Sequence, residues 1–267
     1  MKKTLVVGFL ILAVLSVLIY IINNSEDNSV DYNSESFLSN SNDPIFESPE
    51  KTIEESLIKA IKDKNIEVLS VLENKLKEEY DKNKTSLAMY WKAYIKYATA
   101  RYYDEVGKKK NTKNEILKGI EILEGIENKN SDDYALLGML QGFAIKYLKN
   151  QDVILYNIKA KKNINKALKL DSTNVRAHYV AANHDLYTPK EFGGGKIVEK
   201  HLNDAISIAL TDKKNSFAPT WGKMESYLLL VDYYIQKDDL EKASDLREAL
   251  KKEYSKSQLD QSKANLN

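Results

Sequence analysis

The 267-residue sequence contains no cysteine, and this absence removes several classes of function at once. Disulfide bonds, thiolate nucleophiles, cysteine-ligated metals and a lipid-modified N-terminal cysteine all require a thiol. Four prolines and ten glycines supply little of the turn chemistry that a many-stranded protein needs. The composition is rich instead in Lys, Glu, Leu, Ile, Ala and Tyr, which favours helices.

The sequence also lacks an excess of charge of either sign. Forty Lys and Arg residues oppose 39 Asp and Glu residues, so the net charge is +1 although 30% of the chain is charged. Proteins dedicated to nucleic acid usually carry a clear basic excess. We therefore expect no nucleic-acid partner, and we interpret the basic run at 108–113 as a solvated loop.

Histidine is scarce, with only His178, His184 and His201 in the chain. His178 and His184 are six residues apart, so on one helix they point in different directions, unlike the i, i+4 pair of a metal site. No Ser/His/Asp set shows a recognisable order or nucleophile elbow. We predict that the protein is not an enzyme, with no catalytic residue, no metal ligand and no cofactor, and structural or surface roles for the histidines.

Residues 5–22 form an uncharged apolar run, LVVGFLILAVLSVLIYII. A transmembrane helix needs about 20 such residues, whereas the apolar core of a cleavable signal has about 7–15. Lys2 and Lys3 precede the run and acidic residues follow it, which favours a cytoplasmic N-terminus. We predict a transmembrane signal anchor at 1–22 with the soluble part outside the cytoplasm; the alternative is a secreted protein released by signal cleavage.

Residues 23–50 are dominated by Asn, Ser, Asp and Glu and have too few apolar groups to offset the entropy of ordering, so we predict a flexible linker. Apolar residues then recur at helical spacing, which predicts a helical domain over 51–256 and a polar tail at 257–267. Two apolar stripes at 53–61 and 66–76 indicate the first helices. Further helices are expected at 86–106, 114–126, 132–148, 153–170, 175–187, 196–210, 221–236 and 240–254. No segment alternates convincingly enough to predict a strand.

The expected helices form short-linked pairs that recur about every 42–47 residues, as in a solenoid. The segment ALKLDSTN at 167–174 resembles the end of a tetratricopeptide repeat, A-L-x-L-D-P-x-N, with Ser172 in place of the usual proline. In the last pair, Tyr227, Leu230 and Tyr234 stand where that repeat places bulky residues, and Ala243 where it places a small one. The resemblance covers 132–254 well and 51–126 only by periodicity. It implies an all-α, tetratricopeptide-like α-solenoid of antiparallel helix pairs.

The segment YTPKEFGGG at 187–195 resembles a Y-x-x-P-x-x-F-G-G loop found in a subset of bacterial envelope repeat proteins. The match implies a fold and not an activity. A phosphate-binding loop would need a preceding strand, a different glycine spacing and a Ser or Thr after Lys196, so we predict a structural loop. Pro189 should stop the preceding helix and Phe192 should plug the loop onto the core. The loop residues are Tyr187, Pro189, Phe192, Gly193, Gly194 and Gly195.

In tetratricopeptide repeats, residues of the first helix of each pair line the inner surface. Transferring that spacing predicts a groove lined by Arg176, Tyr179, Asn183, Leu186, Glu225, Leu228, Asp232 and Ile235. The resemblance thus implies a non-catalytic, membrane-anchored scaffold that binds a protein or peptide in the bacterial cell envelope. An accessory solute-binding subunit of an envelope transporter is the alternative, with the lengthened pair around 149–156 lining a cavity.

Overall fold

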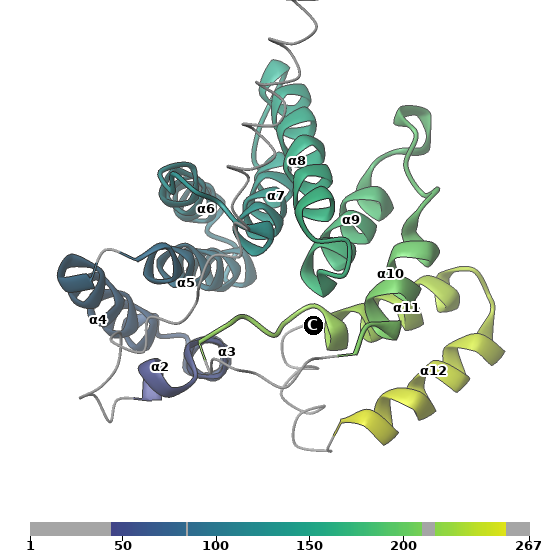
Figure 1. The fold of residues 1–267 in the computed structure, drawn as a ribbon, viewed down its shortest axis with the longest axis horizontal. Coiled ribbons are helices and arrows are strands. Elements are labelled where there is room, and N and C mark those ends of the chain that lie inside the picture. Colours follow the sequence, from purple (N-terminus) through teal and green to yellow (C-terminus); the bar gives the residue numbers. More distant parts are fainter. Residues whose placement is uncertain (1–43, 84, 210–216, 255–267) are drawn as a thin grey trace, which may run out of the picture. The chain divides into compact units, whose positions relative to one another are not determined.

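The computed structural model describes residues 44–83, 85–209 and 217–254 (Figure 1). The chain divides into two units, Met1–Asn33 and Ser34–Asn267, and every described residue belongs to the second. The expected anchor at 1–22, most of the expected linker and the expected tail at 257–267 lie outside the described residues. Within the described ranges, no helix has the length and apolar character needed to cross a membrane.

All regular structure in the described ranges is helical, which confirms the all-α prediction. Ile45 is fully buried, so ordered structure begins within the last residues of the segment expected to be a linker. The helices are α2 (Pro44–Glu47), α3 (Pro49–Asp63), α4 (Glu67–Asn83), α5 (Ser86–Glu105), α6 (Lys109–Glu124), α7 (Ser131–Ile145), α8 (Gln151–Leu170), α9 (Val175–Tyr187), α10 (Val198–Ser207), α11 (Lys223–Gln236) and α12 (Leu240–Glu253), with a short 3₁₀ helix η2 (Lys190–Phe192) between α9 and α10.

One connection predicted from charge is wrong. The basic run at 108–113 is not a loop, because α6 begins at Lys109 and includes most of it. Thr112 in this run is fully buried, and its hydroxyl donates to the carbonyl of Lys108 at 3.2 Å. Exposed lysines are compatible with the first turn of a helix when one face of that turn packs inward. The exposed lysines of this run therefore lie on the solvent-exposed side of the start of α6.

Polar side chains cap the N-termini of several helices. Asn174, the last residue of the ALKLDSTN segment, caps α9 by accepting from the Ala177 N–H at 3.1 Å. Asn130 and Asp133 form a reciprocal capping box at the start of α7, with both bonds 2.9 Å long. Such caps satisfy backbone donors that have no partner inside the helix. The turn chemistry of the sequence thus fixes where these helices begin.

The helices pack as successive pairs, α5 with α6, α7 with α8, α9 with α10 and α11 with α12. The first helices of neighbouring pairs also contact each other, from α3 through α5, α7 and α9 to α11 (Figure 1). Close approach within the α7–α8 pair depends on Gly138, where a Cβ atom would lie 2.8 Å from the side chain of Ile164. A small residue at this crossing lets the larger side chain of the partner helix fill the space.

The segment 217–222, which leads into α11, packs against helices that lie far away in sequence. The Glu50 carboxylate at the start of α3 accepts bonds from the Thr220 N–H at 2.6 Å and the Trp221 N–H at 3.1 Å. The Trp221 indole N–H donates to the Tyr90 hydroxyl of α5 at 2.8 Å. These bonds join residues 131 to 171 positions apart. They tie the beginning of the helical array to its last pair.

Helix α5 is the most deeply buried element that the segment 217–222 contacts. Tyr90 and Trp91 are each 1% exposed, and their rings meet edge to face with centroids 5.1 Å apart. The Trp91 indole N–H donates to the Phe217 carbonyl at 3.0 Å, so the polar atom of this buried ring is satisfied. The aromatic residues Tyr90 and Trp91 of α5 therefore fix the position of the segment 217–222.

The loop after α9 is held by its backbone and not by an apolar plug. The prediction that Phe192 packs onto the core is wrong, because Phe192 is 74% exposed and Tyr187 is 75% exposed. The Gly195 N–H donates to the Asp185 carbonyl at 3.0 Å, and the Ile197 N–H donates to the Asp185 carboxylate at 2.7 Å. The short η2 turn, followed by these bonds, directs Phe192 away from the protein.

Gly194 occupies the tightest backbone contact of that loop. A Cβ atom there would lie 2.8 Å from the Asp185 carbonyl oxygen and closer still to the Thr188 carbonyl oxygen. Its neighbours Gly193 and Gly195 have φ angles of +88° and +77°, which favour glycine. The glycines thus bring the start of α10 close to the end of α9.

Candidate ligand-binding cavity

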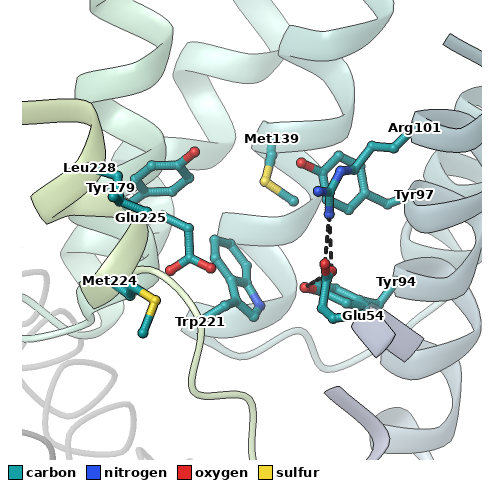
Figure 2. Close-up of a pocket in the computed structure, with 10 residues that line it drawn as sticks. All are labelled: Glu54, Tyr94, Tyr97, Arg101, Met139, Tyr179, Trp221, Met224, Glu225 and Leu228. Atoms are coloured by element: carbon teal, nitrogen blue, oxygen red, sulfur yellow. Dashed lines mark hydrogen bonds and ion pairs between the residues drawn. The ribbon is translucent and has the colours of Figure 1, made fainter. Parts of the chain in front are cut away.

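A cavity of about 100 Å³ lies among the first helices of the array and the segment before α11 (Figure 2). Its walls come from α3, α5, α7, α9 and α11, so residues from nearly the whole described chain meet there. The lining combines aromatic rings, two carboxylates, one guanidinium and two thioethers. The lining residues are Glu54, Tyr94, Tyr97, Arg101, Met139, Tyr179, Trp221, Met224, Glu225 and Leu228.

Four aromatic rings follow one another along the wall of the cavity. The ring centroids are 5.9 Å apart for Tyr97 and Tyr94, 6.3 Å for Tyr94 and Trp221, and 6.1 Å for Trp221 and Tyr179. Burial raises the pKa of the Tyr97 and Tyr179 hydroxyls, so both phenols are neutral at ordinary pH. The wall therefore consists of neutral aromatic rings, whose faces are electron-rich.

On the side of α3 and α5, the charges of the cavity are paired. The Arg101 guanidinium donates to both carboxylate oxygens of Glu54 at 3.0 Å, and the Tyr94 hydroxyl donates to the same carboxylate at 2.8 Å. Burial lowers the pKa of Arg101, but Glu54 and the nearby tyrosines raise it by more, so the pKa lies above its usual value. The guanidinium also lies over the Tyr97 ring, 5.4 Å from its centroid. This wall is electrically neutral.

On the side of α11, Glu225 has no such partner. Its carboxylate accepts a hydrogen bond from the Gly222 N–H at 2.6 Å, which satisfies one backbone donor at the helix start. No cationic side chain in the described part of the chain forms an ion pair with it. Burial raises the pKa of Glu225 to about 7, with the charges of Glu50 and Glu54 adding to the rise. Among the described residues, this wall holds a carboxylate without a counter-ion.

The two sides face each other across the cavity, with Glu225 and Trp221 opposite the Glu54–Arg101 pair (Figure 2). Because Glu54 is neutralised by Arg101, the remaining charge of the site at and above neutral pH comes from Glu225. A desolvated carboxylate is stabilised by any cation that reaches it. The cavity therefore has the charge and the aromatic surface to accept a positively charged group.

Three residues of the predicted groove meet in this cavity, namely Tyr179, Glu225 and Leu228. They come from two different helices, α9 and α11, at the positions to which the repeat spacing assigned them. Their use in binding a ligand stays a prediction.

The other five predicted groove residues do not line the cavity. Arg176 forms an ion pair with a carboxylate of α7 at 2.6 Å. Leu186 packs against the core formed by α9, α10, α11 and α12, and Asn183 is partly buried. Asp232 is exposed, and Ile235 is 38% exposed. The spacing placed them on an inner surface, but only the first turns of α11 and the middle of α9 reach the cavity.

Sequence reasoning missed most of the opposite wall. Glu54 and Arg101 belong to α3 and α5, in the part of the chain where the repeat pattern was visible only as periodicity. Trp221 reaches the cavity because its segment is bonded to Glu50, and no local pattern predicts a contact across 171 residues. The concentration of tyrosines at 90–103 was the available signal for this aromatic wall.

A second group of polar side chains lies between α9 and α10. His178 Nδ1 is 2.9 Å from His201 Nδ1 and 3.6 Å from an oxygen of Asp204. Burial and the neighbouring His178 lower the pKa of His201, and burial lowers the pKa of His184, which lies outside the group. The sequence-based comparison of His178 with His184 missed this pairing, since the partner is on the next helix.

In the described part of the chain the structure is helical throughout, and it contains a partly open, partly charged pocket. No protein-family model and no curated protein matches the sequence. Among solved structures, the HusA haemophore from Porphyromonas gingivalis is similar, with a TM-score of 0.53 and 20% sequence identity. The similarity covers 68% of this chain and 90% of that chain. At this identity the similarity concerns the fold.

Proposed function

We propose that the chain is a non-catalytic binding protein that takes a small organic cation, such as an amine or a quaternary ammonium group, into the cavity. The observation that carries this proposal is the Glu225 carboxylate, which is partly buried beside aromatic rings and has no counter-ion among the described residues. A ligand cation would supply the missing charge. It would also lie within reach of the Trp221 and Tyr179 rings, whose contact with a desolvated cation contributes about 2 kcal/mol.

The size of the cavity restricts the ligand. Pockets for drug-sized molecules measure about 300–1,000 Å³, whereas this one measures about 100 Å³. A head group or a small amine fits this space, and a macrocycle such as haem is too large for it. Haem, which the name of the similar haemophore implies, therefore serves as a comparison ligand in the binding test.

The segment 217–222 favours a small ligand over an extended peptide. It is bonded to α3 and α5 through Glu50, Tyr90 and Trp91, on the inner side where a peptide would otherwise lie. A protein-binding scaffold needs an open groove there. Of the two functions considered from the sequence, solute binding is accordingly the one we propose.

The proposal extends to the setting of the domain. We picture a tetratricopeptide-like array, tethered by a membrane anchor at 1–22 and a spacer, that binds its solute outside the cytoplasm of a bacterium. Each first helix contacts its own second helix and also the first helix of the next pair. This contact pattern supports the repeat assignment. The charge-free run at 5–22 supports the anchor. Delivery of the solute to a transporter in the same membrane would complete this function.

Calorimetric titration of the full chain in detergent tests the proposal. Tetramethylammonium and choline should bind, whereas 3,3-dimethylbutanol, the uncharged analogue of choline, should bind at least about tenfold more weakly. Equal affinity for choline and its neutral analogue would contradict the proposal. So would tight binding of hemin without any binding of the ammonium compounds.

Two variants on one helix locate the binding site. Glu225→Gln keeps an acceptor for the Gly222 N–H but removes the charge, and we expect it to weaken choline binding by about tenfold or more. Asp232→Asn removes an exposed charge from the same helix, away from the cavity, and should leave the affinity unchanged. If both variants bind choline as the parent does, the ligand does not occupy this cavity.

A further inference from the structure

His178, His201 and Asp204 converge from two helices that the FGGG loop joins. His201 and Asp204 are three residues apart on α10 and so share a face of that helix, and His178 approaches them from α9. One ligand-type atom from each residue lies within 4.8 Å of the others. Only 23 residues separate the two histidines in sequence.

The hydrogen bond on the far side of His178 fixes which of its nitrogens is free. His178 Nε2 lies 2.9 Å from the carbonyl oxygen of Ser172. A carbonyl can only accept, so Nε2 carries the proton, and Nδ1 of the neutral ring directs its lone pair toward His201 and Asp204. Metal-bound histidines typically donate their second ring N–H to a carbonyl or carboxylate in this way. The tautomer required of a ligand is thus already imposed by the backbone.

We propose that this cluster binds a divalent transition metal ion of the zinc class through His178 Nδ1, His201 Nδ1 and a carboxylate oxygen of Asp204. Bonds of about 2.0–2.2 Å in a tetrahedral arrangement place donor atoms roughly 3.3–3.5 Å apart. The observed separations, 2.9 Å between the two nitrogens and 3.6 Å from His178 Nδ1 to the Asp204 oxygen, lie on either side of that value. Small movements of the side chains, without movement of the helices, bring all three to bonding distance.

Three protein ligands leave the fourth position of a tetrahedral ion open. In zinc proteins an open position of this kind is filled by water or by an external ligand. His178 is 7% exposed, whereas His201 and Asp204 are partly exposed, so the open position faces solvent on the α10 side. The site therefore suits an ion that is exchanged or that binds a further ligand, more than a fully enclosed structural ion.

Lys200 competes with the metal ion for the Asp204 carboxylate. Its ammonium lies 2.7 Å from the Asp204 carboxylate and is largely exposed to solvent. In the absence of metal this ion pair and the hydrogen bond between the two histidines hold the cluster together. Metal binding displaces the ammonium into water and requires the proton of the neutral His201 ring to move from Nδ1 to Nε2, so that Nδ1 can coordinate. The two helices need not separate, because the loop at Gly194 and the bond from Ile197 to Asp185 fix their contact.

This proposal does not depend on the ligand of the cavity. His178 and Tyr179 are consecutive on α9, so their side chains leave the helix about 100° apart, one toward α10 and the other toward the cavity. Either site can fail its test without affecting the other.

The test uses the full chain, stripped with a chelator and titrated calorimetrically with Zn²⁺. We expect one ion per chain with an affinity in the micromolar range or tighter. His201→Ala should weaken binding by about tenfold or more, and Asp204→Asn should weaken it too. His184→Ala is the matched control, since it removes a histidine from α9 outside the cluster and should change nothing. Circular dichroism of each variant checks that it folds.

Two further measurements separate a coordination site from adventitious binding. Co²⁺ in place of Zn²⁺ should give the visible absorption of a tetrahedral ion in the parent chain and lose it in His201→Ala. Lys200→Met should bind Zn²⁺ at least as tightly as the parent, because it removes the competing cation. Absence of Zn²⁺ binding, equal losses in His201→Ala and His184→Ala, or weaker binding by Lys200→Met would each overturn the proposal.

Discussion

The two faces of α9 carry two candidate sites that are built in opposite ways. Tyr179 faces a cavity whose walls come from five helices, with lining residues from Glu54 to Leu228. His178 faces a cluster completed by α10 alone, the helix that follows α9 after a ten-residue connection. The cavity depends on contacts between distant parts of the chain, and the cluster depends on one local packing angle.

This difference means that the two sites have different points of failure. The cavity is sensitive to the ion pair and the aromatic residues that join α3 and α5 to the segment before α11. The cluster is sensitive to the loop that brings α10 against α9. Substitutions should therefore be able to remove either site alone.

Gly194→Val should have the largest effect and should act on the cluster. The added side chain collides with backbone carbonyls of Thr188 and Asp185, which cannot move without shifting the end of α9. We expect a loss of about 4 kcal/mol of unfolding free energy and loss of Zn²⁺ binding, with choline binding retained below the melting temperature. Denaturant unfolding measures the first effect. Lys190→Ala, in the same exposed loop, should be neutral, and equal destabilisation by both variants would remove the special role of Gly194.

Arg101→Met should come next and should act on the cavity. It leaves the Glu54 carboxylate, which is 20% exposed, without its cation, and loss of one partner of such a partly buried pair costs up to about 3 kcal/mol. The double variant Arg101→Met/Glu54→Gln should recover part of this loss, because no uncompensated charge remains. Zn²⁺ affinity should stay at the parent value in both. A double variant less stable than Arg101→Met would show that the charge of Glu54 is not the cause.

The third prediction concerns pH and the unpaired wall of the cavity. The pKa of Glu225 rises from its ordinary 4.5 to about 7, so the folded chain holds this proton more tightly than the unfolded chain. The resulting stabilisation is complete below about pH 4.5 and is lost as the pH rises through 7. Asp133, whose pKa burial also raises to about 7, contributes in the same direction.

Glu225→Gln should remove the Glu225 part of this dependence. We expect the variant to be more stable than the parent at pH 8 by on the order of 2 kcal/mol and similar to it at pH 4.5. Melting temperatures across this range provide the measurement. Choline favours the charged form of the Glu225 carboxylate. It should therefore bind the parent more tightly as the pH rises through 7, and so stabilise the parent more at high pH than at low pH. A parent and variant with parallel pH profiles would refute the assignment.

Thr99→Val should have the smallest effect and should alter neither site. Thr99 Oγ1 on α5 is the one buried side-chain polar atom in the described residues that has no hydrogen-bond partner. Replacing it with a methyl group of similar size should raise the unfolding free energy by about 1 kcal/mol. Thr112→Val is the control, since it removes a made bond to the Lys108 carbonyl and should destabilise. Destabilisation of equal size at both positions would contradict this explanation.

The helices could be predicted because their apolar periodicity and caps are local. Asn174 and the ALKLDSTN segment located the start of α9, and the repeat spacing placed Tyr179, Glu225 and Leu228 near one another. The position of Glu54 and Arg101 across the cavity from Glu225 could not be predicted, because it follows from contacts between residues more than a hundred positions apart. Phe192 was misplaced because hydrophobicity alone does not tell a buried aromatic from an exposed one on a loop closed by its backbone.

The bonds from Glu50 to Thr220 and Trp221 have a consequence for how the domain unfolds. In an open array of repeats each unit contacts only its neighbours, so terminal units melt first and stability adds unit by unit. Here the first long helix is bonded to the segment that leads into α11, so we expect α3 and α11 not to fray independently. We expect a single cooperative transition, and hydrogen exchange in α3 that is as slow as in the central helices.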